Sequence, residues 1–278
     1  MTEILFYMKE EEKMKWMRRA GIAALSVLLL LTGTGAGALG GKENTKDLHI
    51  EEAFAGTEGT MVLKSLKNDK VYVYNKERSK ERLTPESTFK VANALIGLET
   101  AAVRDEYEVK RWDGVEREFE SWNRDHSLAS AMRESAIWFY QDLARTIGEK
   151  KMQEYVSNIQ YGNQDISRGI DAFWLDSSLK ISAAEQADFI EKLVEEELPF
   201  SQKNQKTVKR MMIQDEQDQF ILHGKTGSRL SDMGLGWYVG FIETEKETWV
   251  FSVNIDGTGT EAKNIAVEVL KEKRIMKD

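Results

Sequence analysis

The sequence predicts an α+β fold, in which an antiparallel sheet is built from both ends of the chain and a helical region is inserted between them. Three observations favour this fold. Short runs rich in aromatic and β-branched residues stand early and late in the sequence. The segment between them repeats its apolar residues at the three-to-four-residue spacing of helices. The 278 residues contain no internal repeat or low-complexity tract, so one large domain or two subdomains with a sizeable core are expected.

The N-terminal part is predicted to be an export signal followed by a linker. A positively charged region precedes an apolar run at 20–31, and Ala36-Gly37-Ala38 matches a small-residue cleavage site. The run is short of the roughly 20 residues that a bilayer-spanning helix needs. Residues 1–38 are therefore predicted to be a signal peptide, with Met14 as an alternative start, and residues 39–48 a polar linker. The expected location is outside the cytoplasm, after transient contact with the export machinery, and an uncleaved membrane anchor is the alternative.

The folded region is expected to begin near His49 and to open with a β-hairpin. Its strands, at 60–65 and 71–74, flank the turn-forming residues Lys67-Asn68-Asp69. An apolar helix is expected next. The charged and aromatic stretch that follows it, at 103–122, predicts a loop with short turns.

The middle of the chain is predicted to be helical and its end to return to strands. The expected helices lie at 128–147, 152–159, 181–198 and 207–212. Ser182 and Glu185 form a capping box at the start of the third helix, and Tyr161-Gly162-Asn163 marks a turn before it. The last elements expected are strands at 220–226, 235–243 and 249–256 and an amphipathic helix at 261–276.

Composition and charge argue against several classes of protein. A net charge of −8 disfavours a general nucleic-acid binder. The absence of cysteine removes disulfides, thiolate nucleophiles and cysteine-ligated zinc. The three histidines, His49, His126 and His223, are far apart in the sequence, which argues against a zinc hydrolase. Carboxylate-rich metal sites remain an alternative. A Ser-His-Asp triad would have to use one of the three histidines, and no G-x-S-x-G elbow accompanies them.

The candidate nucleophile is Ser87, which stands three residues before Lys90 at the start of the apolar helix that is expected to end near Thr100. On a helix, this spacing puts the two side chains one turn apart on one face. A serine attacks only when a base takes its proton, and a lysine is that base only when burial or a neighbour removes its charge. Phe89 and Val91 offer an apolar setting. The S-x-x-K motif suggests acyl transfer, although alone it also fits a capping serine followed by an exposed lysine.

Two further motifs follow in order along the chain. Ser135 stands in Ser135-Ala136-Ile137, within the predicted middle helices, and Lys225-Thr226-Gly227 ends a predicted strand. A lysine and a hydroxyl at a strand edge can hold an anionic substrate, and the glycine lets a backbone approach closely.

With these motifs in this order, the chain resembles the class D (oxacillinase-type) serine β-lactamases, which are related to penicillin-sensing receptor domains. The resemblance runs from about His49 to the C-terminus and is carried by stretches at 87–105, 112–114, 122–126, 161–167, 173–175, 179–182, 198–202, 236–240 and 254–256. It implies the fold of serine β-lactamases and penicillin-binding transpeptidases, with a catalytic domain at 49–278. It also implies hydrolysis of the β-lactam amide of a small-molecule substrate.

The resemblance implies a role for each candidate residue. Ser87 is expected to attack the β-lactam carbonyl and form an acyl-enzyme. Lys90, carboxylated by dissolved CO2 or bicarbonate, is expected to be the general base of both half-reactions. Trp174 matches the tryptophan whose indole N–H donates to that carbamate, with a purely structural core role as the alternative. Ser135 is expected to help pass a proton to the leaving ring nitrogen, and Lys225 to hold the carboxylate side of the substrate.

The substrate-binding residues that the resemblance implies are Ile137, Thr226, Gly227, Ser228 and Lys263. The backbone N–H groups of Ser87 and Ser228 match the oxyanion hole of the family. Ile137 stands where the family has valine, and its extra methylene is expected to alter access of the deacylating water. Lys263 is the nearest candidate for the family arginine that pairs with the substrate carboxylate. Because a lysine is a point charge, carboxylate recognition is expected to be weaker or differently placed.

A β-lactam sensor or penicillin-binding protein that is stably acylated at Ser87 is the alternative function. Sensors of this kind usually follow a membrane-embedded region with a zinc-protease motif. This chain has one apolar segment and no H-E-x-x-H, which argues against a complete receptor. No metal or organic cofactor is implied beyond CO2 or bicarbonate, and the sequence leaves the oligomeric state open.

Overall fold

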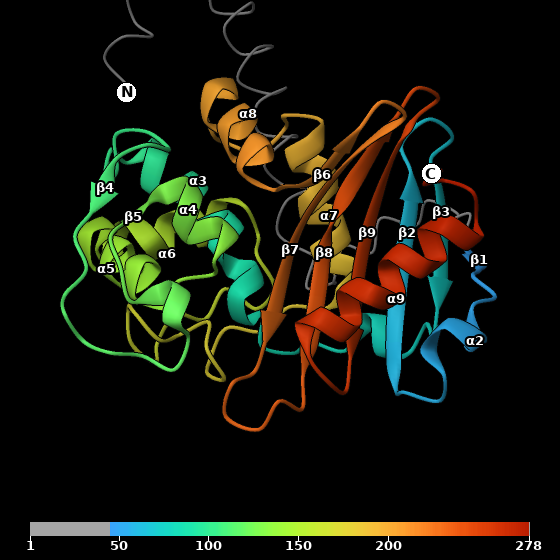
Figure 1. Ribbon diagram of the computed structural model, residues 1–278, viewed down its shortest axis with the longest axis horizontal. Helices are drawn as coiled ribbons and strands as arrows, with labels where there is room; N and C mark the ends of the chain where they lie inside the picture. The colour runs from blue at the N-terminus through green and yellow to red at the C-terminus, as the bar shows by residue number, and fades with distance from the viewer. Residues whose placement is uncertain (1–44, 278) are drawn as a thin grey trace, which may run out of the picture. The chain divides into compact units, whose positions relative to one another are not determined.

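The computed structural model describes residues 45–277 (Figure 1). The predicted signal peptide, the alternative start at Met14 and most of the predicted linker lie outside the described residues. None of the helices between residues 45 and 277 has the length and apolar character that a membrane crossing requires.

The centre of the fold is a seven-stranded sheet in the order β1-β3-β2-β9-β8-β7-β6. Its strands are β1 (Thr45–Asp47), β2 (Gly59–Ser65), β3 (Lys70–Tyr74), β6 (Ile213–Gln217), β7 (Phe220–Ser228), β8 (Gly236–Thr244) and β9 (Thr248–Ile255). All neighbours are antiparallel except β1, which runs parallel to β3. Since β2 pairs with β9, both ends of the chain build the sheet, which confirms the predicted α+β fold.

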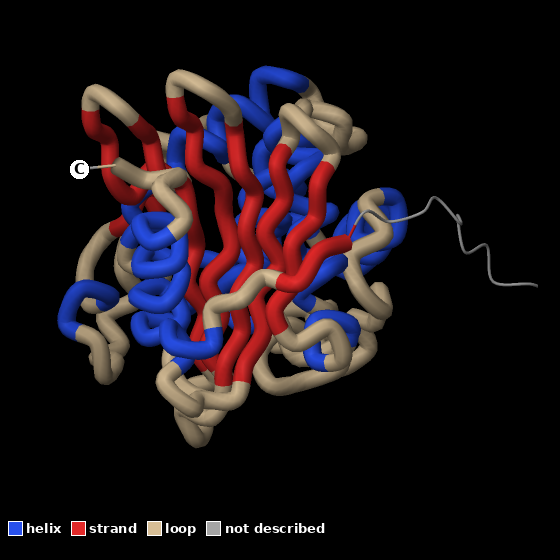
Figure 2. Tube along the Cα trace, turned by 90° about the vertical axis from the view of Figure 1, so that its right-hand side faces the viewer, coloured by secondary structure: helices blue, strands red, loops and turns tan. Residues whose placement is uncertain are grey.

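Helices cover both faces of this sheet, as Figure 2 shows. The C-terminal helix α9 (Gly259–Glu272) and the short α2 (Glu51–Phe54) pack on one face, and α7 (Ala183–Val194) on the other (Figure 1). Side chains alternate along each strand. On β8, Trp237 and Val239 enter the core beneath α7, while Tyr238 and Ile242 enter the core beneath α9.

The inserted helical region stands beside the β7 side of the sheet (Figure 1). Its helices are α3 (Lys90–Glu99), α4 (Leu128–Arg133), α5 (Ile137–Ile147), α6 (Glu149–Asn158) and α8 (Gln202–Met211). Short 3-10 turns are η2 (Arg78–Lys80), η3 (Glu86–Phe89) and η4 (Glu120–Trp122), and β4 (Val109–Lys110) pairs with β5 (His126–Ser127). The stretch at 103–122 is otherwise loop, as predicted.

Several elements differ from the sequence prediction. The helix predicted at 128–147 is wrong, because the chain leaves the helical conformation between α4 and α5. Strands β1 and β6 were not predicted, since both are short edge strands whose mostly polar, exposed residues carry no apolar pattern. β1 lies inside the predicted linker at 39–48, and Leu48 is buried in a core. The fold therefore includes residues before His49. Helix α8 is longer than the helix predicted at 207–212, because it begins at Gln202, directly after the N-cap residue Ser201.

Candidate active site

Ser87 lies in η3, the 3-10 turn that runs directly into α3. Lys90 is the first residue of α3, and its Nζ donates a hydrogen bond to Ser87 Oγ at 2.5 Å. The Lys90 side chain is fully buried, whereas Ser87 is 8% exposed. The turn therefore directs the hydroxyl and the amine toward each other, and of the two residues only Ser87 is in contact with solvent.

The surroundings of Lys90 favour its neutral form. Burial lowers the pKa of Lys90 well below its ordinary value, the positive charge of Lys225 lowers it further, and Glu86 opposes both. The flanking Phe89 and Val91 are fully buried, as the sequence led us to expect. A neutral amine can take a proton from a hydroxyl or react with CO2, and an ammonium ion can do neither.

A chain of hydrogen bonds supports the nucleophile turn from behind. The Tyr161 hydroxyl donates to Gln186 Oε1 at 3.1 Å, and Gln186 Nε2 donates to Thr88 Oγ1 at 2.7 Å. Thr88 Oγ1 donates in turn to Pro85 O at 2.6 Å. Gly162 has a φ of +55°, which favours glycine in the predicted turn at 161–163. This turn therefore supports the site rather than supplying a reacting group.

Trp174 is a buried aromatic residue with one unsatisfied polar atom. Its ring stacks on Phe89, with centroids 5.5 Å apart and planes 28° apart. The indole Nε1–H has no hydrogen-bond partner among the described residues. A buried donor without an acceptor costs about 1–3 kcal/mol, so this position favours an acceptor that the polypeptide does not supply. A carboxyl group on Lys90, which follows Phe89 in the chain, would be such an acceptor.

Ser135 lies in the break between α4 and α5, at a φ of +57°. A continuous helix over 128–147 would not allow this backbone conformation. At the break, the Ser135 hydroxyl meets β7, where Lys225 Nζ donates to Ser135 Oγ at 3.0 Å. The second and third motifs of the sequence therefore meet in the fold.

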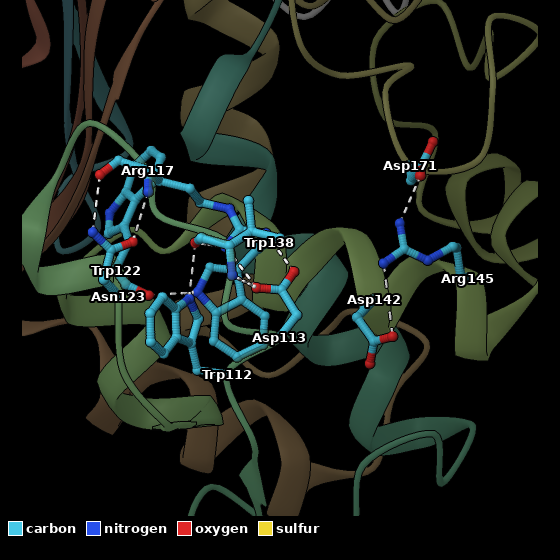
Figure 3. Close-up of polar contacts among 10 residues, drawn as sticks. Trp112, Asp113, Arg117, Trp122, Asn123, Trp138, Asp142, Arg145 and Asp171 are labelled. Carbon is cyan, nitrogen blue, oxygen red and sulfur yellow. Dashed lines mark hydrogen bonds and ion pairs between the residues drawn. The ribbon is translucent and has the colours of Figure 1, made fainter.

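The backbone before Ser135 is held by aromatic and polar side chains, of which Figure 3 shows Trp122, Trp138 and Arg117. Trp122 Nε1 donates to Glu134 O at 2.8 Å, and Trp138 Nε1 donates to Trp122 O at 2.8 Å. The Arg117 guanidinium lies 5.8 Å from the centroid of the Trp138 ring. These contacts satisfy both indole N–H groups and fix the peptide that precedes Ser135.

Strand β7 carries the third motif along an open edge. β6 pairs with β7 only as far as His223, so among the described strands none pairs with the last residues of β7 on that side. A Cβ on Gly227 would lie 3.1 Å from Pro85 O and 3.2 Å from Ser87 N, a tight contact, so glycine favours the close approach that the sequence predicted. Ser228 Oγ accepts a hydrogen bond from the Gly259 N–H at 2.8 Å, which ties the end of β7 to the start of α9.

Lys225 is a second buried amine, 4% exposed. Besides Ser135, its Nζ donates to Thr226 O at 2.9 Å. Burial, followed by the positive charge of Lys263, lowers the pKa of Lys225 from 10.5 to about 7. At neutral pH the amine is therefore poised between donor and acceptor of a proton, and an anionic substrate beside it would favour the protonated form.

Replacing Lys225 by methionine is expected to stabilise the free protein at neutral pH, by about 1–4 kcal/mol, because it removes a buried charge. The pKa of Lys225 is about 7 in the folded protein and 10.5 in the unfolded chain. Between these values the unfolded chain binds more protons, so stability rises with pH over that interval. In the variant, stability should rise less with pH over this interval. The rise that remains comes from Lys90, whose pKa is also lowered by burial. Urea unfolding at about pH 6.5 and pH 9 measures both effects, and a less stable variant at neutral pH would contradict this account.

Lys263 and Ile137 are the two remaining candidate residues. Lys263 Nζ donates to Gln214 Oε1 on β6 at 3.0 Å and lies 6.0 Å from the centroid of the Tyr238 ring. Its amine is engaged at the edge of the sheet and acts on Lys225 through its charge. Ile137 is the half-buried first residue of α5.

Sequence reasoning missed Glu86, which directly precedes Ser87. Glu86 is 2% exposed and adopts a φ of +50°. In the sequence, an acidic residue at the start of a helix is typical of a solvated first turn that complements the helix dipole. The available signal was its place between Pro85 and the nucleophile, at the start of an otherwise apolar run.

Comparison with known proteins gives concordant results. The model of the penicillin binding protein transpeptidase domain matches residues 56–277. The chain is 60% identical to probable beta-lactamase YbxI of Bacillus subtilis (strain 168), over 82% of this chain and 86% of that protein. Its fold matches the class D beta-lactamase BAT-2 with a TM-score of 0.82 and 58% identity, over 83% of this chain and 98% of the other. The C-terminal domain of the Bacillus licheniformis BlaR penicillin-receptor matches with a TM-score of 0.80 and 35% identity, over 84% and 98%.

Proposed function

Because the chain belongs to the penicillin-binding protein transpeptidase domain family, and within it to the class D β-lactamases, we propose that it hydrolyses β-lactams through an acyl-enzyme on Ser87 with carboxylated Lys90 as the general base. The observation that carries this mechanism is the buried Lys90 amine bonded to Ser87 Oγ at 2.5 Å. The Trp174 ring stacks on Phe89, and its indole N–H has no partner among the described residues, which supports the carboxylated form.

In the acylation half-reaction, Ser87 gives up its proton and its Oγ bonds to the β-lactam carbonyl carbon. When present on Lys90, the carboxyl group supplies an oxygen base for that proton. The backbone N–H groups of Ser87 and Ser228 hold the developing oxyanion, each worth about 3 kcal/mol. The ring C–N bond then breaks, and the hydrogen-bonded Ser135 and Lys225 deliver a proton to the leaving nitrogen.

In the second half-reaction, a water molecule adds to the acyl carbon and the bond to Ser87 Oγ breaks. The water gives a proton to the general base, and the base returns one to Ser87. The proton that the base took in the first half-reaction replaces the one that Ser135 and Lys225 delivered, so the net reaction adds one water across the ring amide. The open edge of β7, with Lys225, Thr226 and Gly227, aligns the anionic substrate, and Lys263 contributes its positive charge from the edge of the sheet. No metal takes part in this scheme.

A stably acylated sensor is the second candidate function. The observation that favours it is the shared fold with the C-terminal domain of a penicillin receptor. In that case Ser87 would be acylated by the same groups and water would fail to release the product. Ile137 and Lys263, which depart from the hydrolase pattern, would then be the first residues to examine.

An intact-mass time course separates these functions. The protein from Leu39 onward is mixed with a simple penicillin in bicarbonate buffer, with Ser87→Ala as the control that forms no adduct. We expect a substrate-sized adduct that appears and then decays while penicilloate accumulates. A persistent adduct would identify a sensor or a penicillin-binding protein, and the absence of any adduct would overturn the proposal.

We also propose that the protein acts outside the cytoplasm. The support is the sequence alone, in which a positively charged region, an apolar run at 20–31 and Ala36-Gly37-Ala38 stand in the order of a cleavable signal. N-terminal sequencing of secreted and membrane fractions tests this proposal. A mature N-terminus near Leu39 is expected, and full-length protein in the membrane fraction would identify an anchor.

A further inference from the structure

Glu86 connects the nucleophile turn to the segment that carries Trp174. Its backbone N–H donates to Trp174 O at 3.1 Å. Its carboxylate oxygen Oε1 accepts from the Asp176 N–H at 2.9 Å and from Thr84 Oγ1 at 2.6 Å. One residue therefore binds the chain on both sides of Leu175.

The backbone at this contact is strained on both partners. Glu86 has a φ of +50° and Asp176 a φ of +44°, in the left-handed region that residues other than glycine seldom adopt. Such conformations persist only where the surroundings hold them in place. The hydrogen bonds between Glu86 and the 174–176 segment are what hold these two residues against each other.

The same segment also contacts the loop between β7 and β8. Ser231 Oγ donates to Asp176 Oδ2 at 3.1 Å. Ser231 lies on the exposed side, whereas Glu86 lies on the buried side of Asp176. Asp176 is thus held by an outer contact and an inner contact, and only the inner contact involves the residue next to Ser87.

The charge of Glu86 works against the chemistry that it adjoins. Lys90, Asp176 and Arg229 are the charged groups whose fields couple to its carboxyl. An ionised Glu86 favours the ammonium form of Lys90, which does not react with CO2, and would repel a carboxyl group there. Burial raises the pKa of Glu86, which opposes that ionisation. The charge of Glu86 therefore does not explain why an acidic residue stands at this position. Its hydrogen bonds to Asp176 N and Thr84 Oγ1 do explain it.

We propose that Glu86 is a positioning residue, which holds the Trp174–Asp176 segment on the nucleophile turn through its side-chain oxygen and so determines how firmly Lys90 keeps its carboxyl group. The second half of this statement rests on the proposed function. The first half concerns only the polypeptide and can be tested independently of any activity.

Two substitutions separate the hydrogen bonds of Glu86 from its charge. Glu86→Gln keeps the length and one acceptor oxygen and removes the charge. Glu86→Asp keeps the charge and shortens the side chain by one methylene, so that its oxygen no longer reaches Asp176 N and Thr84 Oγ1 in the observed arrangement. Ser231→Ala is the matched control, because it removes only the outer contact of Asp176.

The first readout is hydrogen–deuterium exchange of the Asp176 amide, and the second is the bicarbonate concentration that gives half-maximal hydrolysis in CO2-depleted buffer. Glu86→Asp is expected to exchange faster and to need about tenfold or more bicarbonate, by analogy with the affinity that metal sites lose when a residue that orients a ligand is replaced. Glu86→Gln is expected to match the wild-type exchange rate and to need no more bicarbonate than the wild type. Ser231→Ala should leave the bicarbonate requirement unchanged.

The opposite ranking of the two variants, with Glu86→Asp like the wild type and Glu86→Gln impaired, would show that charge rather than hydrogen bonding matters and would overturn the proposal. Equal behaviour of both variants and the wild type would do the same. If the wild type needs no bicarbonate at all, the proposed carboxylation of Lys90 is wrong. The exchange measurement by itself then decides whether Glu86 holds the Trp174–Asp176 segment.

Discussion

Replacing Lys90 by alanine is expected to reduce β-lactam turnover by about 10²- to 10⁴-fold, the usual contribution of a general base. The amine is the only group seen bonded to Ser87 Oγ among the described residues, and the substitution leaves the hydroxyl without a base. The Lys90→Ala variant should be a folded protein that either does not react or is trapped as the acyl-enzyme. Steady-state hydrolysis and intact mass measure these two outcomes.

The control for this prediction is Lys67→Ala, in the exposed turn between β2 and β3, which removes a lysine far from the chemistry. Circular dichroism must show that both variants are folded. Added bicarbonate should not restore Lys90→Ala, because no amine remains to be carboxylated. Normal turnover by a folded Lys90→Ala variant would rule out the mechanism.

The buried parts of the fold could be predicted from the sequence because burial leaves a pattern. Strands β7, β8 and β9 are rich in apolar residues, and the Ser182 and Glu185 capping box marks the start of α7 as predicted. Exposed elements leave no such pattern. β1 and β6 are held in the sheet by backbone pairing to β3 and β7, which places no demand on their side chains.

The same distinction applies to the site. Ser87, Lys90, Ser135 and Lys225 could be nominated from motif order, and the fold brings them together. The break at Ser135 was missed because apolar residues recur on both sides of it, at Met132 and Ile137, as they would in one continuous helix. The hydrogen bond from Trp122 Nε1 to Glu134 O, a tertiary contact, helps to fix the break although the local apolar periodicity favours a continuous helix.

Glu86 was missed for a related reason. A charged residue beside a helix start is normally solvated, and nothing local to Pro85-Glu86-Ser87 indicates that a segment 90 residues away covers it. Lys263 shows the opposite case. The family resemblance made it the nearest candidate for the arginine that binds the substrate carboxylate. In the structure its amine donates to Gln214, a residue of the edge strand that the sequence did not reveal.

Replacing Trp174 by phenylalanine is expected to raise the bicarbonate requirement about 10- to 100-fold, as loss of an orienting hydrogen-bond donor does at comparable sites. The smaller ring still packs on Phe89, so the loss of stability should stay within about 1–3 kcal/mol. What the variant lacks is the Nε1–H that has no partner among the described residues. If the proposed mechanism holds, the carboxyl group on Lys90 should be released more readily without this donor, and the acyl-enzyme should accumulate at low bicarbonate.

Bicarbonate rescue distinguishes this variant from Lys90→Ala, because Trp174→Phe keeps the amine and should recover activity at high bicarbonate. Trp249→Phe, at the far end of β9, is the matched control and should show the wild-type requirement. If Trp174→Phe had the wild-type requirement as well, the unpaired indole would be a packing feature of the core and carboxylation would depend on other groups. If it lost activity without rescue, Trp174 would act on the acyl-enzyme itself. Only a shifted and saturable bicarbonate dependence assigns the indole N–H to the carboxylated lysine.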